Sequence, residues 1–298
     1  MTRPAIARAI AAICVIVSVG WFVWVRLLPG EKQLEVTFLD VGQGDSIVVS
    51  TPGNHTLVVD TGRSTSDDDA GRSIVLPFLR SKGLNGIDAL LLTHPDDDHI
   101  GGAISILERL RVGRLLVSGI PSNAPNYVRT LSIARKRRVP IVQLARGQVL
   151  DFHDSVTAEV LNPPTNGSPS RNHADNNGCL VVRIQRQDTS ILLTGDAEVE
   201  AEQDMLSDGE GLHADVLKLG HHGSKTSSSN EFLDSVKPKV AIVSAGIRNV
   251  FGHPNPLVME RVESRGIKIF RTDRDGAITV SSDGHKLTFT HLRQGARK

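Results

Sequence analysis

The sequence has little of what several protein classes need. Of its 298 residues, two are cysteine and one is tyrosine, and aromatic residues make up 4% of the chain. Two cysteines do not make a disulfide framework, and they do not reveal the redox compartment. The formal net charge of +1 gives no global argument for nucleic acid, because DNA-binding domains usually carry a basic excess. A nucleic-acid role therefore has to be argued from local residues.

Glycine and apolar residues are plentiful, at 27 residues and 39% of the chain. Such a composition suits a globular protein with a sizeable core and many tight junctions between strands and loops. Apolar runs typical of strands recur in both halves, and the helical patterns between them cover residues 71–82, 100–110, 125–138, 198–206 and 255–265. There is no fixed-period repeat and no strong linker after the N-terminal segment. We predict an α/β protein with two sheets and helices outside them, in one catalytic domain.

The longest hydrophobic run lies at the N-terminus. Residues 9–25, AIAAICVIVSVGWFVWV, carry no charge and follow Arg3 and Arg8. With its flanks this run is long enough to span a bilayer, and we predict a signal anchor over residues 1–29. The positive-inside bias would then place the hydrolase domain, residues 30–298, outside the cytoplasm. A cleaved signal peptide and a secreted domain stay open, although no small-x-small cleavage site follows the run.

Four polar residues come just after apolar strands. They are Asp60 in VVD, His94 in LLTH, Asp196 in LLTGD and His221 in LKLGHH. In open α/β folds, binding sites form where the ends of strands meet loops, because the scaffold fixes those positions and leaves them accessible. We therefore expect these side chains to share one site.

The segment THPDDDHIGG, residues 93–102, is the strongest single candidate. Imidazole nitrogens and carboxylate oxygens at alternating positions of a tight loop suit Zn²⁺ or Mn²⁺, and more carboxylate favours Mn²⁺. A bound dication would also relieve the repulsion among Asp96, Asp97 and Asp98. The alternative is an acidic turn that caps a helix starting near Ile100. The motifs LLTGD and LKLGHHGS elsewhere in the chain favour the metal site.

The chain resembles the metallo-β-lactamase superfamily, and within it the extracytoplasmic metallohydrolase domain of ComEC-type DNA-uptake (competence) proteins. The motifs DVGQGDS, DTG, THPDDDHIGG, NNGCLVV, LLTGD, LKLGHHGS and GHP occur in that family's order, over about residues 34–285. The resemblance implies an αββα sandwich with two divalent metal ions, manganese or zinc, at one edge. It also implies hydrolysis by a metal-activated water.

The resemblance further implies roles for single residues. The implied ligands are His94 and Asp96 for the first metal, Asp98, His99 and His221 for the second, and Asp196 for both. Asp60 would orient ligands, and Asp97 would point away. Asp45, in the GQGDS loop, is a candidate catalytic residue beside the site, and Asp98 is a candidate acceptor for the proton of the attacking water.

Other residues are candidate substrate contacts. His222, Ser224 or Lys225 could contact a phosphate, and His253 could act as a general acid or contact the substrate. Plainer interpretations stay open for three of them. His222 could pack beneath His221, Ser224 could cap the helix that follows, and His253 could be a solvated histidine.

Two positions depart from the general superfamily motif. Asp96 stands where the general motif has histidine, although the ComEC-type branch shares the aspartate. The histidine usual between the second and fourth motifs has no clear counterpart, and the nearest candidates are Asn176, Asn177 and His173. Asparagine is a poor ligand for Zn²⁺ but acceptable for a harder ion. One metal would then be weakly held, or would need substrate oxygens to complete its ligands.

Three functions remain open. We expect an anchored metal-dependent phosphodiesterase or nuclease that acts on DNA. With one apolar segment, the chain would act on extracytoplasmic nucleic acid alone or beside a separate channel protein. The second function is hydrolysis of a lactone, a β-lactam or another small ester or amide, because this fold hosts many activities. The third is a non-catalytic binding module, and the nearly complete set of ligands argues against it.

Overall fold

The computed structural model describes residues 32–165, 174–209 and 211–292. The predicted signal anchor, residues 1–29, and the candidate His173 lie outside the described residues. Within the described ranges, no helix is both long and apolar enough to cross a membrane.

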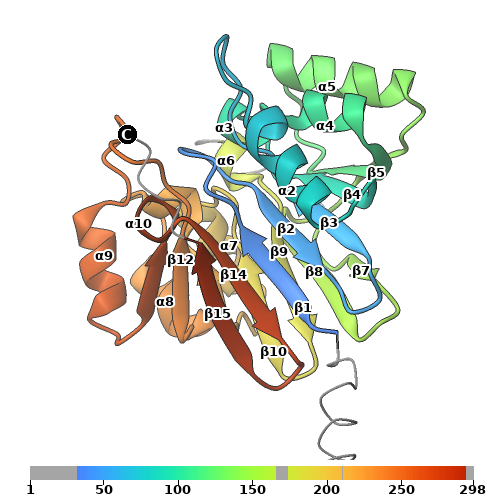
Figure 1. The fold of residues 1–298 in the computed structure, drawn as a ribbon. Helices are drawn as coiled ribbons and strands as arrows, with labels where there is room; N and C mark the ends of the chain where they lie inside the picture. Colours follow the sequence, from blue (N-terminus) through green and yellow to red (C-terminus); the bar gives the residue numbers. More distant parts are fainter. Residues whose placement is uncertain (1–31, 166–173, 210, 293–298) are drawn as a thin grey trace, which may run out of the picture. The chain divides into compact units, whose positions relative to one another are not determined.

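Two sheets form the centre of the fold (Figure 1). The first has the strand order β15-β14-β1-β2-β3-β4-β5-β6. Its strands are β1 (Leu34–Phe38), β2 (Ile47–Ser50), β3 (Thr56–Val59), β4 (Gly86–Leu92), β5 (Arg111–Val117), β6 (Ile141–Gln143), β14 (Ala277–Ser282) and β15 (Leu287–Leu292). The second has the order β13-β12-β11-β10-β9-β8-β7. Its strands are β7 (Val149–Asp151), β8 (Val156–Asn162), β9 (Val181–Arg186), β10 (Thr189–Leu193), β11 (Val216–Lys218), β12 (Val240–Val243) and β13 (Lys268–Arg271).

Each sheet contains a block of parallel strands. In the first sheet β3, β4, β5 and β6 pair in parallel, and in the second β10, β11, β12 and β13 do so. Every residue of β3, β10, β11 and β12 is buried, as expected for parallel strands that are covered on both faces. The carboxyl ends of the strands in each block therefore reach one edge of their sheet.

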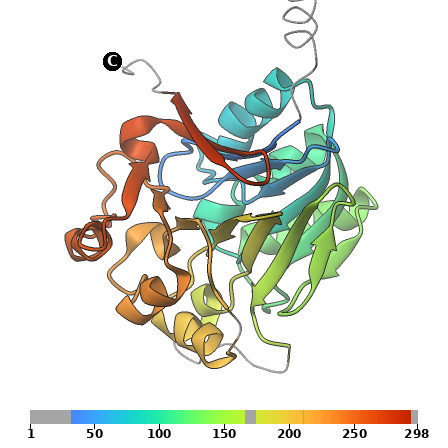
Figure 2. The same ribbon diagram turned by 90° about the horizontal axis from the view of Figure 1, so that it is seen from below.

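Helices cover the outer faces of both sheets, and Figure 2 shows the sheets stacked between them. On the first sheet lie the π-helical turn η1 (Gly71–Val75), α2 (Leu76–Ser81), α4 (Ala103–Arg109) and α5 (Pro125–Lys136). On the second lie α7 (Val199–Ser207), α8 (Asn230–Val236) and α9 (Pro256–Glu263). The short helices in loops are α3 (Asp97–Ile100), α6 (Ala174–Asn177), the 3₁₀ turn η2 (Gly220–Gly223) and α10 (Thr272–Asp275).

Apolar side chains of the described residues form three clusters that hold these layers together. The first lies between the sheets and includes Phe38 of β1 and Val182 of β9. The second, which includes Leu90 of β4, joins the first sheet to its helices. The third joins Leu192 of β10 to Phe232 of α8. The predicted arrangement of two sheets with helices outside is confirmed, and the anchor helix before it stays a prediction.

Candidate metal centre

Four of the predicted polar residues lie at the ends of parallel strands. Asp60 follows β3, His94 follows β4, Asp196 follows β10 and His221 follows β11. The first two strands belong to one sheet and the other two to the second sheet. The site is therefore built where the edges of the two stacked sheets meet, which is why His94 and Asp196, 102 positions apart in the chain, can come together.

The segment after β4 turns at once into α3. Asp96 occupies the residue before this helix, but its side chain makes no capping hydrogen bond. Asp97 accepts a hydrogen bond from Asn126 Nδ2 at 2.8 Å, so α5 engages it. Asp98 Oδ2 lies 3.3 Å from Nε2 of His222 on the other sheet. The aspartates are thus directed to different partners, and a simple acidic helix cap does not describe them.

The DVGQGDS loop packs directly against this segment. Gly44 has a φ of +126°, and a Cβ there would lie 2.1 Å from the carbonyl oxygen of Asp98. Asp45 donates its backbone N–H to the same oxygen at 3.2 Å. Only glycine combines this backbone conformation with so close an approach, so Gly44 is required for the position of Asp98.

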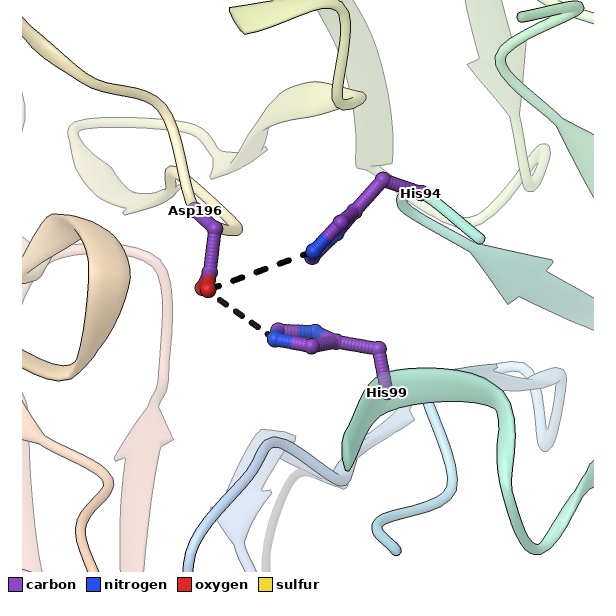
Figure 3. A group of neighbouring side chains, drawn as sticks. All are labelled: His94, His99 and Asp196. Carbon is purple, nitrogen blue, oxygen red and sulfur yellow. Dashed lines mark ion pairs between the residues drawn. The ribbon is translucent and has the colours of Figure 1, made fainter. Parts of the chain in front are cut away.

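The carboxylate of Asp196 lies among the side chains of four histidines. Nε2 of His99 is 3.1 Å from its Oδ1, and Nε2 of His222, His221 and His94 are 3.5, 3.7 and 3.9 Å from its Oδ2. Figure 3 shows two of them, His94 and His99, pointing toward Asp196 from the other side of the site. Asp196 is therefore the centre of the cluster.

Several buried polar atoms of this cluster make no hydrogen bond to any described residue. They are Nε2 of His94, His99 and His222, and Oδ1 of Asp45 and Asp196. Buried polar atoms are normally paired, so a cluster of unpaired ones indicates groups that serve a ligand. Imidazole nitrogen and carboxylate oxygen are ligands that Zn²⁺ and Mn²⁺ accept. The residues therefore fit a divalent cation.

Four groups of donor atoms among the described residues are close enough to hold an ion, and Asp45 belongs to two of them, one with Asp196 and His222 and one with Asp60 and His99. His94, His99 and Asp196 form one group, and Asp98, His99 and His222 form another, with the donor atoms of each within 4.8 Å of one another. Beside the first group, Oδ2 of Asp96 lies 3.6 Å from Nε2 of His94. These groups contain most of the residues that the sequence suggested as ligands.

The neighbouring histidines His221 and His222 face different partners. Both have a left-handed backbone, with φ of +47° and +54°, which is costly for residues other than glycine. Their rings are 6.1 Å apart and inclined at 68°. Nδ1 of His222 donates to the carbonyl oxygen of Ser244 at 2.9 Å, which leaves Nε2 facing Asp98. The structure thus places His222 in the second group, where the sequence suggested His221.

His221 is held by a carboxylate from the loop that follows β10. Its Nδ1 is 3.0 Å from Oε1 of Glu198, a buried carboxylate that also accepts a hydrogen bond from Thr226 Oγ1 at 2.9 Å. This contact fixes the ring so that Nε2 faces Asp196. Glu198 was not predicted from the sequence, although it follows Asp196 by two positions in LLTGDAE.

Asp60 holds His99 in place. Its Oδ2 lies 2.7 Å from Nδ1 of His99 and accepts a hydrogen bond from the Thr93 hydroxyl at 2.7 Å, and its Oδ1 accepts from the Thr93 backbone N–H at 2.8 Å. A carboxylate on one ring nitrogen fixes the tautomer and turns the other nitrogen toward the site. Asp60 therefore orients His99 and does not itself face the cavity.

Asp45 forms a buried ion pair with Lys218, the last residue of β11. Lys218 is fully buried, donates to the Gly195 carbonyl oxygen at 2.7 Å and lies 3.7 Å from Oδ1 of Asp196. Lys218 was not predicted to belong to the site, although a lysine inside the buried strand VLK is unusual. Asp45 thus lies behind the site, where it anchors an internal cation.

The charges of the cluster keep its acidic groups ionised. Burial acts to raise the pKa of Asp196 and of Asp98, but nearby His99 and His222 lower both pKa values below their usual range. Burial acts to lower the pKa of His99, yet the carboxylates of Asp196 and Asp60 raise it above the usual value. Ionised carboxylates bind cations, and protons on the histidines would compete with them.

Of the other residues predicted to contact the substrate or the metal, some line the cavity and others hold the surrounding structure in place. His253 lines the cavity, and burial together with the charges of His221 and His222 lowers its pKa to about 4. Asn177 accepts hydrogen bonds from the backbone of Glu198 at 3.2 Å and of Ala201 at 3.3 Å, so it stabilises the start of α7. It is not among the residues that line the cavity.

Neither Ser224 nor Lys225 lines the cavity. The Ser224 hydroxyl pairs with that of Thr226 at 3.0 Å, and Lys225 is exposed. The prediction that Ser224 caps the following helix is wrong, because Ser229 caps α8 by accepting from the backbone N–H of Phe232. The loop after η2 is longer than the sequence suggested, which moves the cap by five residues.

Comparison with known proteins places this architecture in a family. Residues 39–247 match the model of the Metallo-beta-lactamase superfamily. The chain belongs to this superfamily. The metallo-β-lactamase fold protein YhfI from Bacillus subtilis has the same fold, with a TM-score of 0.56 at 12% identity over 84% of this chain and 100% of that one. The superfamily includes metal-dependent hydrolases, and its fold binds divalent metals, often two.

The relatives of this chain include proteins that are named for competence. The chain is 36% identical over 272 residues to ComE operon protein 3 of Bacillus subtilis (strain 168). The aligned region covers 87% of this chain and 34% of that protein. It is 34% identical over 249 residues to Competence protein ComA of Neisseria gonorrhoeae, covering 83% and 32%. The chain thus spans about a third of the length of these relatives. The resemblance to ComEC-type competence proteins is confirmed.

Proposed function

We propose that this metallo-β-lactamase superfamily hydrolase is a phosphodiesterase that cleaves DNA and is related to competence DNA uptake. The observation that carries the proposal is the Asp196 carboxylate, surrounded by four imidazole Nε2 atoms beside a cavity of about 250 Å³. Arg63 and Phe251 line the same cavity, and they offer a phosphate contact and a flat apolar surface. Relatives named competence proteins support DNA as the substrate.

The charge of the cavity supports a role for cations. The carboxylates of Asp96, Asp97, Asp98 and Asp196 line it, and a DNA phosphate would be repelled by them. We propose that two divalent ions, manganese or zinc, offset this charge. The proposed ligands are His94, Asp96, Asp196 and His221 for one ion, and Asp98, His99, His222 and Asp196 for the other. When bound, the ions would polarise the phosphodiester and lower the pKa of a water molecule.

The side chains around the ions have separate tasks in this proposal. Asp98, an ionised carboxylate at the cavity, would hold the attacking water by accepting a hydrogen bond from it, whereas its lowered pKa makes it a weak acceptor for the proton. His253 has a pKa of about 4 and is therefore neutral at pH 7, so it contacts the substrate by a hydrogen bond and does not act as a general acid. Asp60 and Glu198 hold the rings of His99 and His221 so that Nε2 of each faces Asp196 and the proposed ions.

Hydrolysis assays with defined metals test the proposal. The purified full-length chain is freed of metal, given Mn²⁺ or Zn²⁺, and assayed on DNA, on bis-p-nitrophenyl phosphate and on a panel of lactones, β-lactams and esters. We expect metal-dependent cleavage of DNA and of the small phosphodiester. Turnover of the esters alone would establish the small-molecule hydrolase in its place. A protein that binds metal and cleaves nothing would be a binding module.

We also propose that residues 1–29 anchor the protein and hold the hydrolase domain outside the cytoplasm, where it could serve a separate channel protein. The charge pattern of the N-terminal segment supports this orientation. In bacterial spheroplasts that express the chain, externally added protease should digest the domain while a cytoplasmic marker survives. Protection of the domain until lysis would contradict the orientation, and release into the medium would indicate a cleaved signal peptide.

A further inference from the structure

Three exposed apolar side chains lie in one loop, and one of them lines the cavity. Ile247, Val250 and Phe251, in the loop between β12 and α9, are 70%, 92% and 61% exposed. Clustered exposed apolar residues mark surfaces that bind something. Phe251 also lines the cavity that holds Asp196, whereas its neighbour Val250 does not. This placement links the loop to the substrate more directly than to a membrane or a partner protein.

The ring of Phe251 continues a row of rings that starts at the metal centre. The His221 and His253 rings are 5.4 Å apart, and Phe251 is stacked on His253 at 5.9 Å with an angle of 27° between the planes. His253 lies beneath one face of the Phe251 ring and supports it. A planar group bound next to a phosphate at the centre could therefore lie against Phe251.

Arg63 gives the same cavity a contact for phosphate. It follows β3 of the first sheet, whereas Phe251 follows β12 of the second, and both line the cavity. Arg63 is exposed and forms no ion pair within the described part of the chain. A guanidinium that is not neutralised by a carboxylate is well suited to hold a phosphate.

We propose that Phe251 stacks on the base next to the scissile phosphate and so selects single-stranded DNA, an inference that rests on the proposed phosphodiesterase activity. In a duplex both faces of a base are covered by its neighbours, so a base reaches an aromatic side chain only when it is unpaired and turned outward. Because every base has a flat face, the selection is for strand state and not for sequence.

Kinetics on matched substrates test this inference with the full-length chain. Wild type and Phe251→Ala are compared on a single-stranded oligonucleotide, its duplex and a single strand with abasic sites around the cleavage position. Because Phe251→Ala loses the stacking contact with one base, its KM for the single strand should be about tenfold higher than that of wild type, with kcat within about twofold. Phe251→Trp should restore the wild-type KM. On the abasic strand, wild type and Phe251→Ala should have the same KM.

The matched control is Val250→Ala, which removes the neighbouring exposed apolar side chain and should leave KM unchanged. A 2-aminopurine base beside the cleavage position gives a second measurement, because its fluorescence should fall on binding to wild type and not to Phe251→Ala. An unchanged KM for Phe251→Ala, or an equal rise on the abasic strand, would overturn the inference alone. If wild type cleaves neither DNA nor bis-p-nitrophenyl phosphate, the proposed phosphodiesterase activity itself fails.

Discussion

Replacement of Asp196 by asparagine is expected to lower hydrolysis by roughly a thousandfold or more and to remove bound divalent metal. Asparagine has the same size, so the fold around β10 is kept, but it lacks the charge that faces His99 and His222. An amide is also a poorer metal ligand than a carboxylate. Metal analysis of the dialysed protein and initial rates on bis-p-nitrophenyl phosphate measure both effects.

The reason for so large an effect is the central position of Asp196. Its two oxygens lie within 3.9 Å of the Nε2 atoms of four histidines, so both proposed ion sites depend on it. The matched control is Asp234→Asn, an exposed carboxylate that pairs with Arg265 at 2.8 Å. That variant should keep metal and rate within about twofold of wild type. Wild-type metal content and rate in Asp196→Asn would contradict a central role.

The site residues at the ends of strands could be predicted because the pattern that marks a strand end lies in the adjacent sequence. Apolar runs that end in Asp60, His94 and Asp196 mark buried strands, and parallel strands bring such ends to one edge. The neighbouring residues in the sequence do not determine which of His221 and His222 faces Asp98. Their side chains diverge because both residues adopt a left-handed backbone, and this conformation depends on contacts such as His222 with Ser244 and His221 with Glu198.

The fold could also be predicted where the sequence pattern is long enough to define an element by itself. Helices expected over residues 71–82 and 125–138 lie at Gly71–Ser81 and Pro125–Lys136, since several turns of periodic pattern suffice to define them. The short strands β6 and β7 were not predicted. They have three residues each, which are exposed or half-buried, and they form only by pairing with β5 and β8 at the edges of the sheets.

Lys218 is the second residue whose replacement should have a large effect, and the effect is on folding. It is the internal counter-ion of a cluster of carboxylates, where it pairs with Asp45 and lies 3.7 Å from Asp196. Burial acts to lower the pKa of Lys218, but these two carboxylates raise it above its usual value, so the ammonium stays charged. Removing one partner of a buried ion pair leaves an uncompensated charge in the core.

Lys218→Met is therefore expected to destabilise the metal-free protein by about 3–5 kcal/mol. Methionine fills a similar volume, so the loss comes from the charge and not from a cavity. Saturating Mn²⁺ or Zn²⁺ should recover part of the stability, because a bound dication restores positive charge beside Asp196 and binds only the folded chain. Urea denaturation with chelator and with metal measures the free energy of unfolding in both states.

Lys82→Met is the matched control, because Lys82 pairs with Glu35 at 2.8 Å on the surface and both side chains are about 40% exposed. An exposed pair of this kind contributes about 0–1 kcal/mol. If Lys218→Met lost no more stability than Lys82→Met, the buried carboxylates would not need an internal cation.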